Sequence, residues 1–287
     1  MGQTPKYQLN TIRINQFFLK EHSVAFEFLK LLHHHGVEAR FVGNVVRQYL
    51  FNYFHEKKIQ SLQISEYDIC VNASPQQLKQ ILKVLDISFL QENMNYGTFK
   101  FCYGQQNLEL ACLRRDYNHK GRHCIVEFID SFELDTSRRD FTFNAITIDH
   151  HGCIFDYHNG QEDIMQKHVH FILEAKKSIQ EDVLRLWRYV RFCAEFDVKP
   201  DLSIMQYARE YSDLLKKLPF KKILYEWHKI IKKDHNVLFY LKTLHDYDMT
   251  QNFLGNFIYP TDSEVFVKKN INAYYPNIPK WALDAIH

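Results

Sequence analysis

The sequence lacks any uninterrupted apolar stretch that approaches the length of a membrane span. Its first ten residues lack the hydrophobic core of a secretion signal, and we find no internal repeat or low-complexity linker. The six cysteines include no CxxC pair, and most stand among apolar, strand-like residues, which favours buried free thiols in a reducing compartment. We therefore expect a cytoplasmic globular protein with no membrane partner.

A strong excess of charge of either sign is also missing. Lysine and arginine number 36 against 34 aspartates and glutamates, which leaves a formal net charge of +2. This balance gives no global affinity for polyanions, so any binding of nucleic acid must depend on a local patch. The 287 residues are 46% hydrophobic, which is enough for one large domain or two smaller ones with cores of their own.

The spacing of apolar residues divides the chain into two parts. Up to about Asp156 helical and strand-like patterns mix, and from about Lys176 the pattern is helical almost throughout. Strands are expected at 37–43, 66–71, 97–103, 107–113, 124–129 and 145–150, and helices at 24–36, 44–54, 74–85, 179–196, 203–218 and 220–233. We predict an α+β domain with a mixed sheet at 1–165, a helical part at 166–250 and a short helical remnant at 251–287.

Two carboxylates stand two positions apart in the strand-like segment SEYDICVNASP. Because side chains alternate along a strand, Glu66 and Asp68 are expected to point to the same side, where their like charges repel. Mg²⁺ prefers such oxygen ligands and commonly joins carboxylates to substrate phosphates. Glu109, which stands between two leucines in another predicted strand, could join them from the same side.

The segment FVGNVVR leads from a predicted strand directly into a predicted helix. Gly43 lies at the turn, where backbone amides and the helix N-terminus form an anion site, and Arg47 lies one turn inside the helix. Alone, an ExD pattern most often lies on a solvent-exposed face of a strand, and a glycine between a strand and a helix usually serves only to form the turn. Together, the acids, the turn and the arginine predict a two-metal site for phosphoryl or nucleotidyl transfer.

These motifs, in this order, resemble a known family. FVGNVVRQYL followed by EYDICVNASP is similar to the head-domain signature of class II tRNA nucleotidyltransferases, the CCA-adding enzymes, and of the related bacterial poly(A) polymerases. The run RRDFTFNA at 138–145 is the most specific match, and GTFKF, LELACLRRD and DYHNGQEDI extend the resemblance. It implies a nucleotidyltransferase-type head, a helical neck that selects the base and a truncated body.

The resemblance also implies roles for the matching residues. The implied catalytic residues are Glu66, Asp68 and Glu109, with Glu66 and Asp68 as ligands of two Mg²⁺ ions. The implied nucleotide-binding residues are Gly43, Asn44, Arg47, Arg139, Asp140, Asn144, Glu181, Asp182, Arg185 and Arg188. Of these, Gly43 and Arg47 would seat the triphosphate, and Arg139 and Asp140 would contact the sugar.

The segment EDVLRLWRYVRF resembles the neck helix with which the family reads the incoming base. Arg185 lies four positions after Glu181 and three after Asp182, and Arg188 lies three after Arg185, so one predicted helix is expected to present them on one face. Ser178 with Glu181 fits a capping box at its start. Without the head motifs, an exposed helix carrying ion pairs would be the favoured interpretation.

The implied function is the transfer of CMP or AMP from CTP or ATP to the 3′-hydroxyl of an RNA, with tRNA as the expected acceptor. CCA addition and A-only tailing share these motifs and both stay open, as does the oligomeric state. Asn44 replaces the second glycine of the family pattern, Gln48 an aspartate and Glu66 the first metal aspartate. These departures favour the alternative of a catalytically diverged member that binds nucleotide, RNA or a protein.

Overall fold

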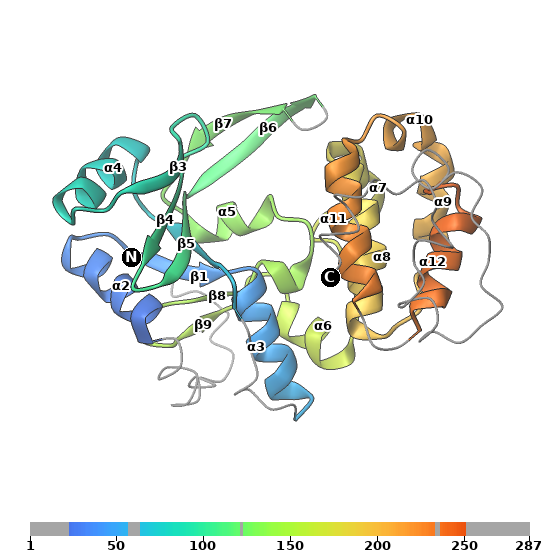
Figure 1. The fold of residues 1–287 in the computed structure, drawn as a ribbon, viewed down its shortest axis with the longest axis horizontal. Coiled ribbons are helices and arrows are strands. Elements are labelled where there is room, and N and C mark those ends of the chain that lie inside the picture. Colours follow the sequence, from blue (N-terminus) through green and yellow to red (C-terminus); the bar gives the residue numbers. More distant parts are fainter. Residues whose placement is uncertain (1–22, 57–63, 121–122, 233–235, 251–287) are drawn as a thin grey trace, which may run out of the picture. The chain divides into compact units, whose positions relative to one another are not determined.

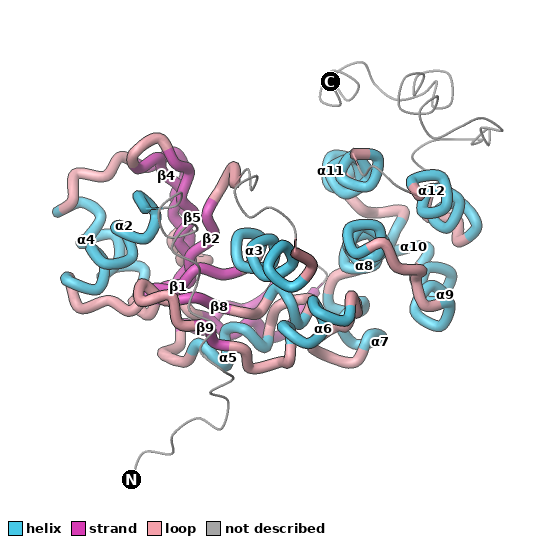
Figure 2. The backbone as a smooth tube through the Cα atoms, turned by 90° about the horizontal axis from the view of Figure 1, so that it is seen from below, coloured by secondary structure: helices cyan, strands magenta, loops and turns pink. Residues whose placement is uncertain are grey.

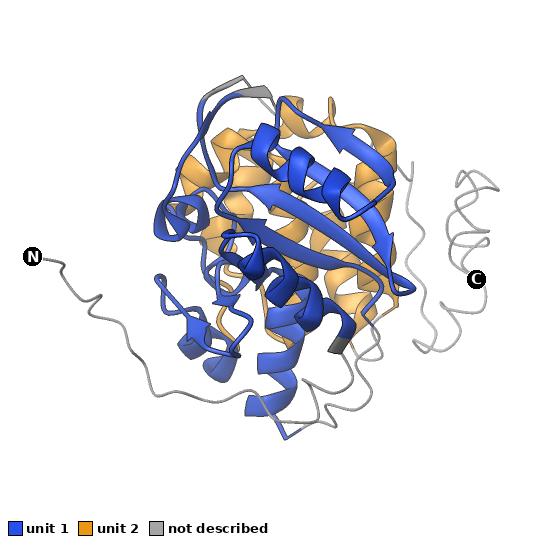
Figure 3. Ribbon diagram, turned by 90° about the vertical axis from the view of Figure 1, so that its left-hand side faces the viewer, with its two compact units in different colours: residues 1–166, 170–173 blue, residues 167–169, 174–287 orange. Residues whose placement is uncertain are grey.

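The computed structural model describes residues 23–56, 64–120, 123–232 and 236–250. The chain divides into two compact units, which Figure 3 shows in different colours. Of the described residues, unit 1 contains those up to Gln166 together with His170–Leu173, and unit 2 contains Lys167–Val169 and those from Glu174 to Thr250. The helical remnant predicted at 251–287 lies outside the described residues.

Unit 1 is built on a seven-stranded mixed sheet (Figure 1). In spatial order its strands are β3 (Phe89–Asn93), β4 (Thr98–Tyr103), β5 (Gln106–Cys112), β2 (Tyr67–Val71), β1 (Ala39–Val42), β8 (Thr147–Ile148) and β9 (Ile154–Phe155). β2 and β5 run parallel, and the other neighbouring pairs are antiparallel. The prediction of a mixed sheet is confirmed.

Helices pack around this sheet, whose strands form a continuous band in Figure 2. The helices of unit 1 are α2 (Ser23–His34), α3 (Asn44–Phe54), α4 (Pro75–Val84), α5 (Phe132–Ser137) and α6 (Gly160–Gln166), with a 3₁₀ turn at Thr142–Asn144. The apolar face of α2 meets the strands through Phe26, 4.8 Å from the Phe41 ring, and through Phe28, 5.4 Å from the Phe101 ring. All four aromatic side chains are buried, so they form part of the core between helix and sheet.

The sequence prediction missed three strands of unit 1, and each carries little of the core. β3 is an edge strand whose side chains are exposed or half-buried, so it shows no alternation of apolar residues. β9 has only two residues, and the polar strand β6 (Arg114–Lys120) pairs with β7 (His123–Phe128) in a separate two-stranded sheet. Hydrophobic periodicity therefore could not reveal them.

Unit 2 is helical in its described residues. Its helices are α7 (Ala175–Glu181), α8 (Leu184–Phe196), α9 (Leu202–Glu210), α10 (Ser212–Leu215), α11 (Phe220–Ile231) and α12 (Val237–Asp246). α8 packs against α11 and α12, and Trp187, Trp227 and Tyr240 are buried in this core. A buried ion pair joins α8 to α11, with Arg191 Nε 2.5 Å from Glu226 Oε2.

The helix predicted at 179–196 is in fact divided. Asp182 has extended backbone angles (φ −148°, ψ 106°) and ends α7, and its Oδ1 accepts a hydrogen bond of 3.0 Å from the amide of Leu184, where α8 begins. The capping box predicted for Ser178 and Glu181 is wrong, because Ser178 lies inside α7 and Glu174 precedes that helix.

In the described part of the chain, no helix has the length and apolar character needed to cross a membrane.

Candidate active site

Three carboxylates meet on the sheet of unit 1. Asp68 of β2 is paired with Glu109 of β5 in the parallel register, and Glu66 directly precedes β2. One oxygen of each carboxylate lies within 4.8 Å of the others. The structure thus brings together the three predicted catalytic residues, which we call the acidic trio.

A lysine lies beside the acidic trio on the neighbouring strand. Lys100 of β4 is paired with Glu109 in the antiparallel register. Its Nζ lies 2.6 Å from Glu109 Oε2 and 3.0 Å from Glu66 Oε1. The sequence analysis missed this residue, although its position between the buried Phe99 and Phe101 indicates a side chain on the opposite face of β4.

The charges at this place perturb one another. Burial raises the pKa of Asp68, Glu109 and Glu66 raise it further, and Arg139 and Lys100 partly oppose them, so the pKa reaches about 6. Burial alone would lower the pKa of Lys100, but its contacts with Glu109 and Glu66 outweigh burial and raise it. Lys100 is therefore a cation at neutral pH.

Gly43 forms the turn between β1 and α3, beside Asp68. Its φ is 73°, in the region that favours glycine. A Cβ placed on Gly43 would lie 3.1 Å from Asp68 Oδ2, which is closer than an ordinary contact. Both the backbone angle and the space explain why glycine occupies this turn, and they place the N-terminus of α3 next to the acidic trio.

Four of the predicted nucleotide-binding residues form one hydrogen-bonded network. Arg47 donates from Nη2 to Asn44 Oδ1 (2.7 Å) and from Nη1 to Asn144 Oδ1 (2.5 Å). Asn144 Nδ2 then donates to Asp140 Oδ1 (3.0 Å), and Gln48 Nε2 donates to Asn44 Oδ1 (3.0 Å). Because Arg47, Asp140 and Asn144 are buried, this network fixes the first turn of α3 to the 3₁₀ turn. Contact of Arg47 with a phosphate stays a prediction.

Asp135 is a buried acceptor that holds the arginine pair of the RRDFTFNA run. It accepts hydrogen bonds from Arg138 Nη2 (2.8 Å), from Arg139 Nη2 (3.2 Å) and from the amide of Arg114 (3.1 Å). Burial alone would raise the pKa of Asp135, but the two arginines and the amide outweigh burial and lower it. The sequence analysis did not single out Asp135, although its spacing of three and four positions from the arginines was a helical signal.

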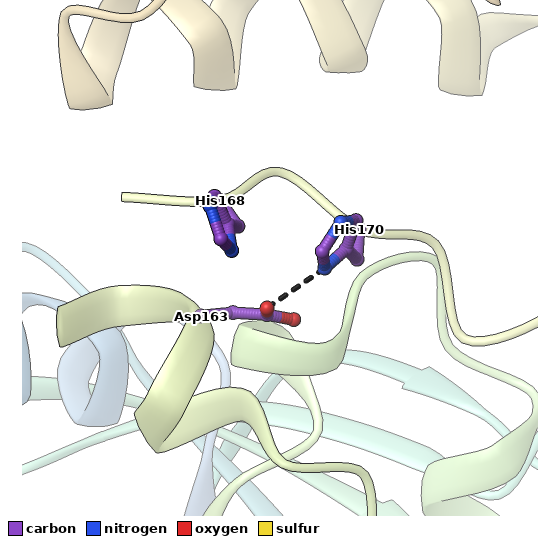
Figure 4. Close-up of side chains that lie close together, drawn as sticks. All are labelled: Asp163, His168 and His170. Carbon is purple, nitrogen blue, oxygen red and sulfur yellow. Dashed lines mark hydrogen bonds and ion pairs between the residues drawn. The ribbon is translucent and has the colours of Figure 1, made fainter. Parts of the chain in front are cut away.

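The DYHNGQEDI segment is tied to the RRDFTFNA run by buried contacts. The Asp156 carboxylate accepts hydrogen bonds from three backbone amides at 158–161. Asp163 accepts a hydrogen bond of 2.6 Å from Thr142 Oγ1, and its other oxygen contacts His170 Nδ1 at 2.8 Å (Figure 4). A Cβ on Gly160 would collide with the Thr142 carbonyl oxygen at 2.5 Å, so glycine is needed for this close approach.

The predicted base-selecting residues lie in unit 2. Arg185 Nη1 donates to Glu181 Oε2 (3.0 Å) and to Ser178 Oγ (2.9 Å), across the break between α7 and α8. Asp182 ends α7 and accepts a hydrogen bond from the amide of Leu184 at the start of α8, and Arg188 follows Arg185 within α8. Glu181 and Arg185 are thus paired with each other. Reading of a base by Glu181, Asp182 and Arg185 stays a prediction, as does contact of Arg188 with the nucleotide.

Comparison with known proteins identifies the family. The profile of the poly(A) polymerase head domain matches residues 39–170. The chain belongs to the class II family of CCA-adding nucleotidyltransferases and bacterial poly(A) polymerases. It is 31% identical over 248 residues to human mitochondrial CCA tRNA nucleotidyltransferase 1, which covers 83% of the chain and 54% of that relative.

Other members of the class II family show the same partial overlap. The CCA-adding enzyme of Listeria monocytogenes serovar 1/2a is 34% identical over 221 residues, covering 76% of this chain and 52% of the relative. The crystal structure of the Bacillus stearothermophilus CCA-adding enzyme in complex with CTP matches with a TM-score of 0.67 and 27% identity, covering 82% and 54% of the two chains. The chain therefore spans about half the length of these relatives.

The acidic trio of this class II family member suits a divalent cation. Carboxylate oxygens are ligands that Mg²⁺ prefers, and three of them converge within 4.8 Å. Burial, followed by the charges of Glu109 and Glu66, raises the pKa of Asp68, and a bound dication would favour its ionised form. Glu66, Asp68 and Glu109 are the residues that could hold it.

Proposed function

We propose that this protein adds CMP or AMP, taken from CTP or ATP, to the 3′-hydroxyl of a tRNA without a nucleic-acid template. The observation that carries the proposal is the acidic trio beside the Gly43 turn and the hydrogen-bonded network of Arg47. The names of its relatives support tRNA as the acceptor, and the CTP complex of the Bacillus stearothermophilus enzyme supports a nucleoside triphosphate as the donor.

In the proposed reaction the 3′-oxygen of the RNA forms a bond to the α-phosphorus, and pyrophosphate leaves. Two Mg²⁺ ions held by Glu66 and Asp68, with Glu109 assisting, would activate the hydroxyl and stabilise the leaving group. Gly43 leaves the turn free of a side chain, so that backbone amides at the start of α3 can approach the phosphates. The Arg47 network holds this turn in place, and Arg139 adds positive charge near Asp68.

The proposed base selection uses the carboxylates and guanidinium groups of unit 2. Arg185 and Glu181 hold each other by an ion pair of 3.0 Å, which orients the donors and acceptors before a base arrives. Such preorganised groups can match the hydrogen-bonding edge of cytosine or adenine. A ladder of products would separate CCA addition, which ends after a short fixed extension, from the tailing of RNA with many adenylates.

A second candidate is a diverged family member that binds nucleotide or RNA without transferring it. The observation that favours this candidate is the contact of Lys100 with Glu66 and Glu109, which engages two of the three acids. Gln48, where the family pattern has aspartate, offers no carboxylate and donates a hydrogen bond to Asn44.

The test is an extension assay with labelled CTP and ATP on a tRNA that lacks its terminal residues and on an unrelated oligonucleotide, with and without Mg²⁺. We expect Mg²⁺-dependent labelling of the tRNA that Asp68→Ala abolishes. The exposed Asp130→Ala is the matched control and should retain full labelling. Binding of nucleotide with no incorporation by the unmodified chain would replace the proposed function by the second candidate.

A further inference from the structure

Lys100 makes the most direct cationic contact with the acidic trio that the structure describes. The register places Lys100, Glu109 and Asp68 side by side across β4, β5 and β2, so the ammonium is a cross-strand neighbour of the acids. Lys100 donates to Glu66 and contacts Glu109 at 2.6 Å. Arg139, the other cation that affects Asp68, donates to Asp135 instead.

We propose that Lys100 is a resident counter-ion of the acidic trio and competes with divalent cations for Glu66 and Glu109. This inference rests on the proposed function only in taking the acidic trio as the metal site. An ammonium group is a compact point charge with three donors, so it can take the place of a metal ion between two carboxylates. A dication that binds both acids must first separate them from Lys100.

The exposure of these groups makes the competition reversible. The side chains of Lys100 and Glu66 are 35% and 39% exposed, so solvent reaches both groups and the ion pair can open. The flexible lysine stem can therefore release the acids without disturbing the strand. Before nucleotide binds, Lys100 lowers the affinity of the site for divalent ions, so metal loading becomes coupled to the arrival of the triphosphate, which carries its own Mg²⁺.

The test measures binding of Mn²⁺ by electron paramagnetic resonance, with no nucleotide or RNA present. Lys100→Met keeps most of the length of the side chain and removes its charge, and this variant should bind Mn²⁺ at least about tenfold more tightly than the unmodified chain. Lys100→Arg keeps the charge and should stay close to the unmodified chain. The exposed Lys83→Met is the matched control for loss of one positive charge and should change nothing.

A second substitution tests whether the gain in Mn²⁺ affinity depends on the carboxylates that Lys100 contacts. Adding Glu66→Gln to Lys100→Met should remove the gain, because one of the two competed carboxylates is then lost. An Mn²⁺ affinity of Lys100→Met within twofold of the unmodified chain, or no Mn²⁺ binding by either, would overturn the inference. Because no transfer is measured, a tenfold gain together with a failed extension assay would retain the inference and reject the proposed function.

Discussion

Replacing Asp68 by asparagine should stabilise unit 1 at neutral pH. In the folded chain the pKa of Asp68 is raised from 3.8 to about 6, so between these values the folded state binds the proton more readily than the unfolded state. The contribution of Asp68 to stability is therefore greatest below pH 4 and is lost as the pH rises through about 6. This difference in pKa corresponds to about 3 kcal/mol in the free energy of unfolding, which Asp68→Asn should recover above pH 6 and not at pH 4.

Hydrogen exchange of the β2 and β5 amides is the suitable assay because it reports on unit 1 directly, whereas Trp187 and Trp227 lie in unit 2. After correction for intrinsic rates, Asp68→Asn should show greater protection at pH 8 and unchanged protection at pH 4. The exposed Asp130→Asn is the matched control and should show neither effect. Equal gains at both pH values, or a loss at pH 8, would refute the reasoning.

Three other substitutions test separate parts of the structure. Gly43→Ala places a side chain at a φ of 73° and crowds the acidic trio, so it should cost about 1–3 kcal/mol, measured by hydrogen exchange of α3. Asn144→Ala removes one acceptor of the buried Arg47 and should weaken CTP binding in a titration, with about 1–3 kcal/mol lost from unit 1. Arg191→Met leaves the buried Glu226 carboxylate without its ion pair and should destabilise unit 2 by about 3–5 kcal/mol in urea titrations followed by tryptophan fluorescence. Unchanged values for these variants would contradict the respective contacts.

The local features of the site could be predicted from the sequence because they depend on periodicity. Alternation along a strand placed Glu66 and Asp68 on one side, and the glycine between a strand and a helix marked the turn beside them. The contact of Lys100 with Glu109 depends instead on the register of β4 against β5, which the spacing of residues along the chain does not encode.

The division of the predicted neck helix could not be foreseen for a similar reason. The apolar residues keep a helical spacing through the break, whereas Asp182 ends α7 by an extended backbone and a side-chain hydrogen bond to the start of α8.

Asn44 shows the limit of a comparison with a motif. The family pattern has glycine at this position, but the Asn44 side chain accepts hydrogen bonds from Arg47 and Gln48 and is part of the network that holds the turn.

The central claim is that the acidic trio of unit 1 performs nucleotidyl transfer. Its most direct test is the single-turnover incorporation of labelled CMP into a tRNA that lacks its terminal residues, compared between the unmodified chain, Asp68→Ala and Asp130→Ala. The account predicts one labelled product and one released pyrophosphate per transfer for the unmodified chain and for Asp130→Ala, and none for Asp68→Ala. Incorporation by Asp68→Ala at the rate of the unmodified chain would contradict it.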